Sequence, residues 1–166
     1  MSHHSLKGSI KAVFRRCAIM IGSWAWVPNY LAQITRFDKF LQRKTNGAWS
    51  LLRLAGLPGI VLTVVGRKSG LPRSTPLLCT PFRGGVLIAG SNFGGPTLPV
   101  WVGNLRAAGH ALVRFRGVES DMIAHELEGD ERAEAWETML QTWPNYRLYA
   151  ERTDRVIPVF LLESAA

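Results

Sequence analysis

The sequence predicts an α+β barrel preceded by a helical N-terminal segment. Three observations support this fold class. Short, apolar, β-branched runs recur after Gly59 and are separated by Gly- and Pro-rich turns, as in antiparallel sheets. Two segments with helical spacing interrupt these runs, and residues before Gly59 carry their apolar side chains at helical spacing. We therefore divide the 166-residue chain into an N-terminal helical segment, 1–58, and a barrel domain, 59–166.

The N-terminal segment contains two predicted helices. Over residues 9–24 apolar side chains repeat at helical spacing, with Lys11 and Arg15 on the other side. A second helix is predicted over 30–44, with Gly47 as its stop, and a short apolar segment follows at 49–54.

The uncharged stretch that begins at Cys17 allows three interpretations. It runs for 19 residues, near the length of a bilayer span, but Pro28 interrupts it. The cations before it resemble those of a signal peptide, although no convincing cleavage site follows. We favour an amphipathic helix that contacts a membrane surface through residues 9–27, over a helix packed on the barrel or a true span or signal.

The barrel domain is expected to contain six strands and three helices. The strands are predicted at 60–65, 74–82, 86–90, 111–116, 118–127 and 156–162. The helices are predicted at 99–108, at 130–141 and, after a turn at Pro144, over a short segment holding Tyr146 and Tyr149.

Charge is distributed unevenly along the chain. Residues 1–80 hold 12 Lys or Arg and one acid, a balance of +11, whereas residues 81–166 hold 8 and 11, a balance of −3. A basic half suits an anionic partner. Aromatic side chains are not interleaved with these cations as they are in nucleic-acid grooves, so we expect no nucleic-acid partner. Cys17 and Cys79 lie far apart and form no Cys-x-x-Cys, which predicts neither disulfides nor a zinc site and fits a cytoplasmic location.

Two stretches are the strongest candidates for a functional site. The first, residues 66–77, reads GRKSGLPRSTPL between two apolar runs, which predicts a hairpin whose tip carries cations and hydroxyls. Arginine forks pair with phosphates and carboxylates at short range. The second, residues 91–106, is a Gly-rich loop that runs into a helix with Pro99 in its first turn. Free amide groups at such a loop favour an anion.

Together these stretches resemble the deazaflavin-dependent nitroreductase family, split-β-barrel reductases that use reduced coenzyme F420. The resemblance covers roughly residues 60–158 and depends on GRKSG-x-PR-x-x-PL, on the Ser-x-x-Gly loop and on Pro-x-Trp-x-x-Asn-Leu. It implies an antiparallel split β-barrel of the FMN-binding type, with inserted helices. No Ser-His-Asp, Cys-His or paired-carboxylate arrangement is visible in the sequence, so the cofactor would carry the chemistry. No metal is expected.

The resemblance assigns site residues position by position. The phosphate and acidic tail of F420 would bind to Arg67, Lys68, Ser69 and Arg73. The ring and its side chain would border Ser74, Thr75, Pro76, Leu77, Leu78, Ala89, Gly90, Ser91, Asn92, Val100, Trp101, Val102, Gly103 and Asn104. Trp101 is equally well explained as a core residue.

Tyr146 and Tyr149 match the substrate-side tyrosines of the family, where a phenol can orient or protonate a reduced acceptor. Core packing is the alternative for both. Asn92 stands where the nitroimidazole-reducing pattern has Lys, and Leu78 stands where it has Tyr. Whether nitro compounds are reduced is therefore left open.

The expected function is hydride transfer from reduced F420 to a small lipophilic, quinone-like or other unsaturated or nitro acceptor. The expected location is the cytoplasm, at the inner face of the cell membrane. The alternatives are a non-catalytic carrier of deazaflavin or lipid on the same fold, and an FMN-dependent split-barrel enzyme. The sequence determines neither the physiological acceptor nor the oligomeric state.

Overall fold

The computed structural model describes Arg16, Met20 and residues 57–165. The chain divides into two units, Met1–Pro58 and Gly59–Ala166, and the second is described by itself below. The predicted helices over 9–24 and 30–44 and the apolar segment at 49–54 lie outside the described residues, except that Arg16 and Met20 are helical and exposed.

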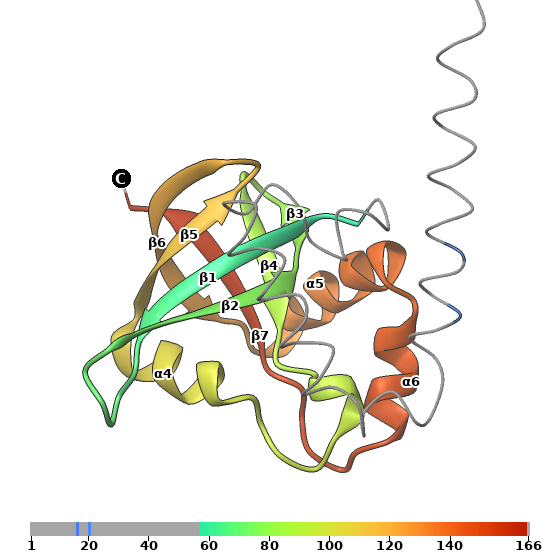
Figure 1. The fold of residues 1–166 in the computed structure, drawn as a ribbon. Coiled ribbons are helices and arrows are strands. Elements are labelled where there is room, and N and C mark those ends of the chain that lie inside the picture. Colours follow the sequence, from blue (N-terminus) through green and yellow to red (C-terminus); the bar gives the residue numbers. More distant parts are fainter. Residues whose placement is uncertain (1–15, 17–19, 21–56, 166) are drawn as a thin grey trace, which may run out of the picture. The chain divides into compact units, whose positions relative to one another are not determined.

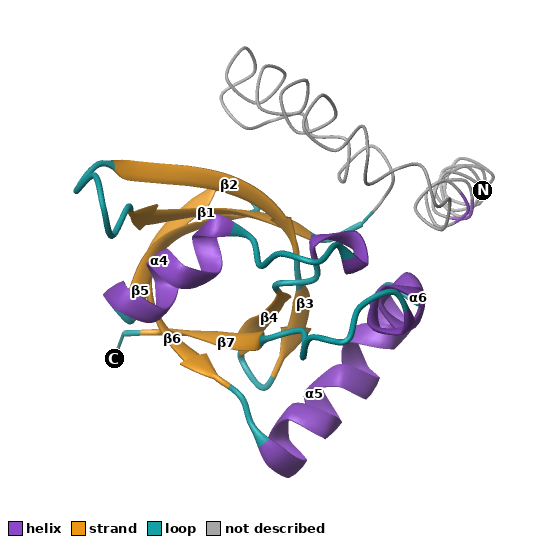
Figure 2. Cartoon of the chain, turned by 90° about the horizontal axis from the view of Figure 1, so that it is seen from below, coloured by secondary structure: helices purple, strands orange, loops and turns teal. Residues whose placement is uncertain are grey.

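One curled antiparallel sheet forms the second unit (Figure 1). Its strands are β1 (Gly59–Val65), β2 (Pro72–Leu78), β3 (Thr80–Phe82), β4 (Gly85–Ala89), β5 (His110–Phe115), β6 (Val118–Glu126) and β7 (Val159–Ser164). Their order across the 7-stranded sheet is β2-β1-β5-β6-β7-β4-β3. Seen from below, the strands curl around a common core, with α4 (Val100–Ala108) at one side (Figure 2). The predicted α+β split β-barrel is confirmed.

The predicted strand over 74–82 is two strands, and the break between them explains how the sheet forms a split barrel. β2 pairs with β1 and β3 pairs with β4, so β2 and β3 are the two edge strands of the sheet. Cys79 alone separates them. The chain therefore passes from one edge of the sheet to the other across a single residue, and the two edges approach each other along a seam.

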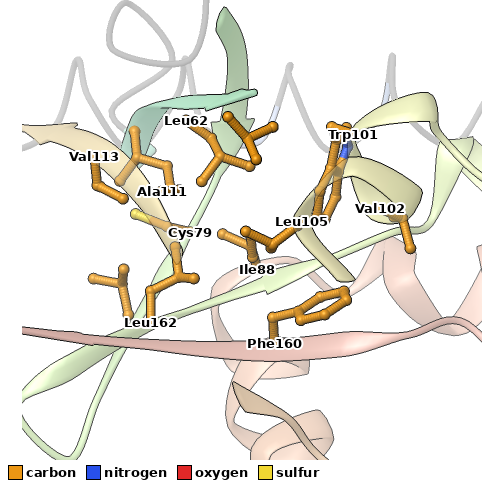
Figure 3. Close-up of a cluster of buried hydrophobic side chains, with 13 residues drawn as sticks. Leu62, Cys79, Ile88, Trp101, Val102, Leu105, Ala111, Val113, Phe160 and Leu162 are labelled. Atoms are coloured by element: carbon orange, nitrogen blue, oxygen red, sulfur yellow. The ribbon is translucent and has the colours of Figure 1, made fainter. Parts of the chain in front are cut away.

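Alternating side chains of the strands fill the core (Figure 3). In β1 every second residue is buried, as expected for a strand with one face on the core. Leu62, Ile88 and Leu162 have no exposed surface and come from three different strands. Burying each of these side chains stabilises the fold by about 2 kcal/mol. Cys79 lies among them with no exposed surface, which places the seam against the core.

Helix α4 packs on this core through Trp101, Val102 and Leu105. It ends at Gly109, whose φ of 71° is the left-handed conformation that glycine favours at a helix C-terminus. The other helices are α5 (Gly129–Thr142), which contacts β3 and β7, and α6 (Asn145–Glu151), which lies beside α5 (Figure 2). The predicted helices over 99–108, 130–141 and around Tyr146 are confirmed.

Two further local features differ from the prediction. A short 3-10 helix, η1 (Asn92–Gly94), lies inside the Gly-rich loop. The last strand begins at Val159 instead of 156, because Pro158 before it has no N–H for the sheet.

In the part of the chain that the structure describes, no helix combines the length and the hydropathy that a bilayer crossing requires. Within the same residues no group of three His, Cys, Asp or Glu side chains is placed to bind a metal ion.

Candidate functional site

The turn between β1 and β2 is closed around Gly66. Its N–H donates to the carbonyl of Leu71 at 2.9 Å, and its own carbonyl accepts from the N–H groups of Gly70 at 2.8 Å and Ser69 at 3.1 Å. A Cβ on Gly66 would lie 2.7 Å from Ser69 Oγ, which would have to rotate away, and 3.2 Å from the carbonyl oxygen of Leu71, so the turn favours glycine at this position. Gly70 has a φ of 65°, the left-handed conformation that also favours glycine. The Gly-x-x-x-Gly spacing thus builds a tight turn.

Three cations stand on or beside this turn without a carboxylate partner. Arg67, Lys68 and Arg73 are exposed. The ion pairs between Arg or Lys and a carboxylate within residues 57–165 lie elsewhere, at Arg83–Glu134, Arg106–Glu126 and Arg114–Glu119. The positive charge of the turn is therefore not neutralised by any carboxylate of the described residues, and it can attract an anion.

The hydroxyls beside these cations take part in local hydrogen bonds. Ser69 Oγ accepts from the Leu71 N–H at 3.4 Å, and Ser74 Oγ lies 2.8 Å from Thr63 Oγ1 on the neighbouring strand. Each hydroxyl has capacity for a further hydrogen bond, because a hydroxyl both donates and accepts.

A buried amide joins the turn to α4. The Asn104 side chain is only 4% exposed, and its Oδ1 accepts a hydrogen bond from the Arg67 N–H at 3.2 Å. Gly103 presents no side chain on α4 at this point, and a Cβ there would lie 3.2 Å from Arg67 Cζ. The Arg67 guanidinium therefore lies over the glycine of α4, and the two sequence motifs meet at this contact.

The loop after β4 is seated against α4 and the chain before β7. Gly90 N–H donates to the carbonyl of Pro158 at 2.9 Å. A Cβ on Gly90 would lie 2.8 Å from both Pro158 Cγ and Val102 Cγ2. Glycine is therefore required by close packing at this position. The hairpin and the 89–95 loop therefore both contact α4.

The predicted cofactor residues differ in accessibility. Arg67, Lys68, Ser69, Arg73, Ser74 and Val100 are exposed. Those with partly accessible surfaces are Thr75, Pro76, Leu77, Leu78, Ser91, Asn92 and Gly103. Ala89, Gly90 and Asn104 are buried, and Trp101 and Val102 belong to the core, with the Trp101 and Phe160 ring centroids 5.9 Å apart.

The Asn92 side chain forms a hydrogen bond within its own loop. Its Nδ2 donates to the carbonyl of Thr97 at 3.0 Å. Its φ is 45°, and that of Phe93 is 55°. Left-handed backbone is tolerated by asparagine but is uncommon for a bulky aromatic residue. The position where the nitroimidazole-reducing pattern has a cation is thus occupied here by a loop-bracing amide.

Tyr146 and Tyr149 lie in an aromatic cluster between α5, α6 and η1. Both are buried, at 4% and 2% exposure. Their ring centroids are 6.1 Å apart, the Tyr149 ring is 5.4 Å from that of Phe93, and the Tyr146 ring is 5.7 Å from that of Trp136. The Tyr149 hydroxyl accepts from Trp143 Nε1–H at 3.3 Å. Phe93 therefore connects the tyrosines to the underside of the loop.

Burial controls the ionisation of this cluster. Desolvation raises the pKa of the Tyr146 hydroxyl above its ordinary value, with a smaller contribution from Tyr149. Desolvation also raises the pKa of Tyr149, partly opposed by its hydrogen bond from Trp143. Both phenols therefore keep their protons to a higher pH than an exposed tyrosine does.

One residue of this region was missed by the sequence analysis. The Arg155 guanidinium donates to the carbonyls of Gly90, Gly95 and Ser91 at 3.1, 3.0 and 2.6 Å. Burial lowers the pKa of Arg155 from its ordinary value. No local pattern marks this residue, because its partners lie some 60 positions earlier in the chain.

Residues 34–164 match the family model of the F420H(2)-dependent quinone reductases. An F420H(2)-dependent quinone reductase of Mycobacterium tuberculosis (strain H37Rv) is 28% identical over 141 residues, which cover 82% of this chain and 95% of that protein. The solved structure of an F420-H2 dependent reductase is 36% identical and superposes with a TM-score of 0.60, covering 64% of this chain and 94% of that one.

Two further solved structures extend the comparison. One, described as a domain-swapped dimer, is 31% identical with a TM-score of 0.62 and covers 81% of this chain and 98% of that one. A heme binding protein from Mycobacterium smegmatis shares only the fold, at 17% identity and a TM-score of 0.54 over 66% of this chain and 47% of that one. Because the family match spans most of the chain, from residue 34 to 164, the chain belongs to the F420H(2)-dependent quinone reductase family and is an F420-dependent oxidoreductase.

Proposed function

We propose that this protein transfers a hydride from reduced F420 to a lipophilic quinone bound beside the 89–95 loop. The observation that carries the proposal is the turn after β1, where Arg67, Lys68 and Arg73 have no carboxylate partner among the described residues. A multivalent cation site suits a cofactor that ends in a phosphate and a chain of carboxylates.

The residues around the turn fit such a cofactor. Arg67, Lys68, Ser69 and Arg73 would hold its phosphate and acidic tail, since they are exposed and carry donors. The ring would lie along the partly accessible part of β2, Thr75–Leu78, and the loop at Ser91 and Asn92. Gly103 leaves α4 without a side chain where Arg67 crosses it. When bound, reduced F420 supplies the hydride.

Reduction of a quinone to a quinol by a hydride also requires one proton. Tyr146 carries a phenol, which is protonated at neutral pH, and Tyr149 lies beside it. We propose that Tyr146 orients the acceptor or supplies a proton to it, and that Tyr149 supports this hydroxyl. The hydrogen bond between Trp143 and Tyr149 favours such a supporting role. Other unsaturated or nitro acceptors are proposed to enter at the same place, along the apolar wall at Leu78.

Titration of the purified protein tests the proposal. Oxidised F420, FMN and NADPH are each added and binding is followed by fluorescence. We expect F420 to bind most tightly. Preference for FMN would instead indicate an FMN enzyme on the same fold.

Addition of menadione to the protein with reduced F420 then tests turnover. We expect multiple turnovers with recovery of the oxidised-cofactor absorbance. Tight F420 binding without turnover on menadione or other quinones would indicate a carrier.

We propose in addition that residues 1–58 form a separate segment and that residues 9–27 hold a cytoplasmic protein at the inner face of the membrane. The support is the arrangement of Lys7, Lys11, Arg15 and Arg16 along an apolar helical pattern. Each cation near an anionic surface contributes about 1 kcal/mol.

The full chain and a variant with these four cations changed to Gln are sedimented with vesicles of varied anionic lipid content. We expect only the wild type to sediment at low salt; both in the supernatant would refute the contact.

A further inference from the structure

We propose that Arg155 is a positioning residue for the F420 pocket, holding the backbone of the loop from Gly90 to Gly95 in its ligand-binding conformation. This inference rests on the proposed function of that loop. It assigns to Arg155 no contact with the cofactor or the acceptor.

The contacts of Arg155 are unusual for a surface cation. Three different guanidinium nitrogens donate to three carbonyls of one loop: Nη1 to Gly90 at 3.1 Å, Nη2 to Ser91 at 2.6 Å and Nε to Gly95 at 3.0 Å. No carboxylate within the described residues pairs with it. The planar fork of arginine thus matches the spacing of three backbone acceptors, and a lysine ammonium cannot reproduce that geometry.

The segment between these contacts has a backbone that needs support. Asn92, Phe93 and Gly94 have φ values of 45°, 55° and 79°. Consecutive left-handed residues are uncommon, and for Phe93 the conformation is costly unless its surroundings hold it. Arg155 contacts the loop on both sides of this segment, at Gly90 and Ser91 before it and at Gly95 after it.

The hydrogen bonds from Arg155 also determine which way the N–H groups of the loop point. In a trans peptide the carbonyl of one residue and the N–H of the next point in opposite directions. Because Arg155 binds the carbonyls of Gly90 and Ser91, the N–H groups of Ser91 and Asn92 point away from it. Neither N–H has a hydrogen-bond partner among residues 57–165. Two oriented donors are thus left for a ligand of the loop.

A second attachment joins the loop to the segment that carries Arg155 and leads into β7. The Gly90 N–H donates to the Pro158 carbonyl at 2.9 Å, three residues after Arg155. The 155–158 segment therefore forms hydrogen bonds with both the N–H and the carbonyl of Gly90. Substituting Arg155 removes one of these two attachments and leaves the other, so we expect loosening of the loop without loss of the barrel.

The experiment compares Arg155→Ala and Arg155→Lys with wild type and with the matched control Arg147→Ala, an exposed arginine on α6 outside the proposed site. Three properties of the full chain are measured: the Kd of oxidised F420, the amide hydrogen-exchange rates of the free protein, and the urea midpoint of unfolding. For Arg155→Ala we expect F420 binding to weaken by about tenfold or more, since charge-assisted contacts that order the loop are lost. Exchange should accelerate in residues 90–95 while the barrel strands stay protected.

Arg155→Lys separates positioning from charge. It should keep the urea midpoint near that of wild type but recover F420 affinity only in part, and millimolar guanidinium should restore binding to Arg155→Ala. Full recovery of affinity and of slow exchange by lysine would overturn the three-point clamp. Wild-type Kd and wild-type exchange in Arg155→Ala would overturn the inference entirely. If wild-type protein itself fails to bind F420, the proposed function fails, and the exchange rates of the loop still decide whether Arg155 orders it.

Discussion

Single side chains set the chemistry of this site by choosing particular partners. The Asn104 amide is buried, and a buried amide costs stability unless it is hydrogen-bonded. Its acceptor binds the Arg67 N–H, and this contact brings a turn residue next to a helix residue 37 positions later in the chain. The amide therefore positions the first cation of the turn, while Lys68 and Arg73 are left exposed to solvent and ligand.

Removal of the cation farthest along the turn tests the anion site. Arg73→Ala should weaken F420 binding by about tenfold or more, because a charge-assisted hydrogen bond contributes roughly 1.5–3 kcal/mol. The loss should shrink at high salt, since exposed charges are screened. Fluorescence titration at two salt concentrations measures both effects.

Arg116→Asn is the matched control for this prediction. Arg116 follows Phe115, which pairs with Ile60 at the opposite end of β1 from the turn, and Asn tolerates its φ of 52°. The control removes the same unit of charge from the protein. Equal losses in both variants would mean that net charge, not a site at Arg73, determines affinity.

The hydroxyl of Tyr146 is tested by removing one atom. Tyr146→Phe should leave the Kd of F420 unchanged and lower kcat and kcat/KM alike, by about a hundredfold if the phenol transfers a proton. Steady-state rates with menadione and other quinones measure this. Tyr149→Phe is the comparison, because its hydroxyl already accepts from Trp143 and its loss should mainly lower stability. Wild-type turnover in Tyr146→Phe would leave both tyrosines with a packing role in the aromatic cluster.

At the scale of elements, the site depends on how the hairpin, α4 and the Gly-rich loop are attached to one another. Arg67 attaches the hairpin to α4, and Gly90 brings the loop against Val102 of the same helix. α4 is in turn packed on the core through Trp101 and Leu105. A helix anchored in the core therefore determines the separation between the cations of the turn and the amides of the loop.

Asn104→Ala should uncouple the hairpin from α4. The Arg67 N–H loses its protein partner, which costs about 1–3 kcal/mol in unfolding free energy, and F420 affinity should fall because Arg67 is no longer held over Gly103. Urea unfolding and F420 titration measure the two effects. Asn145→Ala, which removes another buried amide, should lower stability without changing affinity. Unaltered F420 affinity in Asn104→Ala would show that the turn keeps its geometry without this hydrogen bond.

The molecule as a whole combines a strongly basic first half with a slightly acidic second half. Within the described residues the acids of the second half are partly paired, at Glu119, Glu126 and Glu134, and the cations of the turn are not. The barrel unit, residues 59–166, holds 11 Lys or Arg and 11 acids, so the three cations of the turn form a local positive patch on a unit without net charge. Such a patch attracts an anion where the cofactor is proposed to bind.

Stability should decrease as the pH rises above about 9. Burial raises the pKa of the Cys79 thiol to about 12, and it also raises the pKa values of Tyr146 and Tyr149. An unfolded chain releases these protons near their ordinary pKa values, about 9 for the thiol and about 10 for the phenols, whereas the folded chain retains them. Unfolding then releases protons, so the free energy of unfolding falls with rising pH, by about 1.4 kcal/mol per pH unit for each such group.

Urea midpoints measured between pH 8 and 11 check this dependence. Cys79→Ala should lower the midpoint at every pH, because it leaves a cavity, and should flatten the decline that begins near pH 9. A midpoint that is constant to pH 11 in the wild type would contradict the burial of these groups.

Much of this architecture can be read from sequence, because local patterns carry it. Alternating apolar residues around Leu62 and Val113 predict strands, and Gly66 and Gly70 predict the turn between two of them. The helix after Pro99 is predicted in the same way, and the two motifs at similar spacing identify the family. These features depend on residues near one another in the chain, where steric and hydrophobic preferences act directly.

Tertiary structure alone decides the rest. The break at Cys79 arises because the sheet must curl until its two edges meet, and no local preference at that residue requires it. The hydrogen bond between Arg67 and Asn104 and the clamp of Arg155 join residues 37 and 60 or more positions apart. The burial of Tyr146 and Trp101 likewise depends on which elements pack over them. A side chain's type limits what it can bind, but its partner is selected only when the folded chain brings distant backbone within hydrogen-bonding reach.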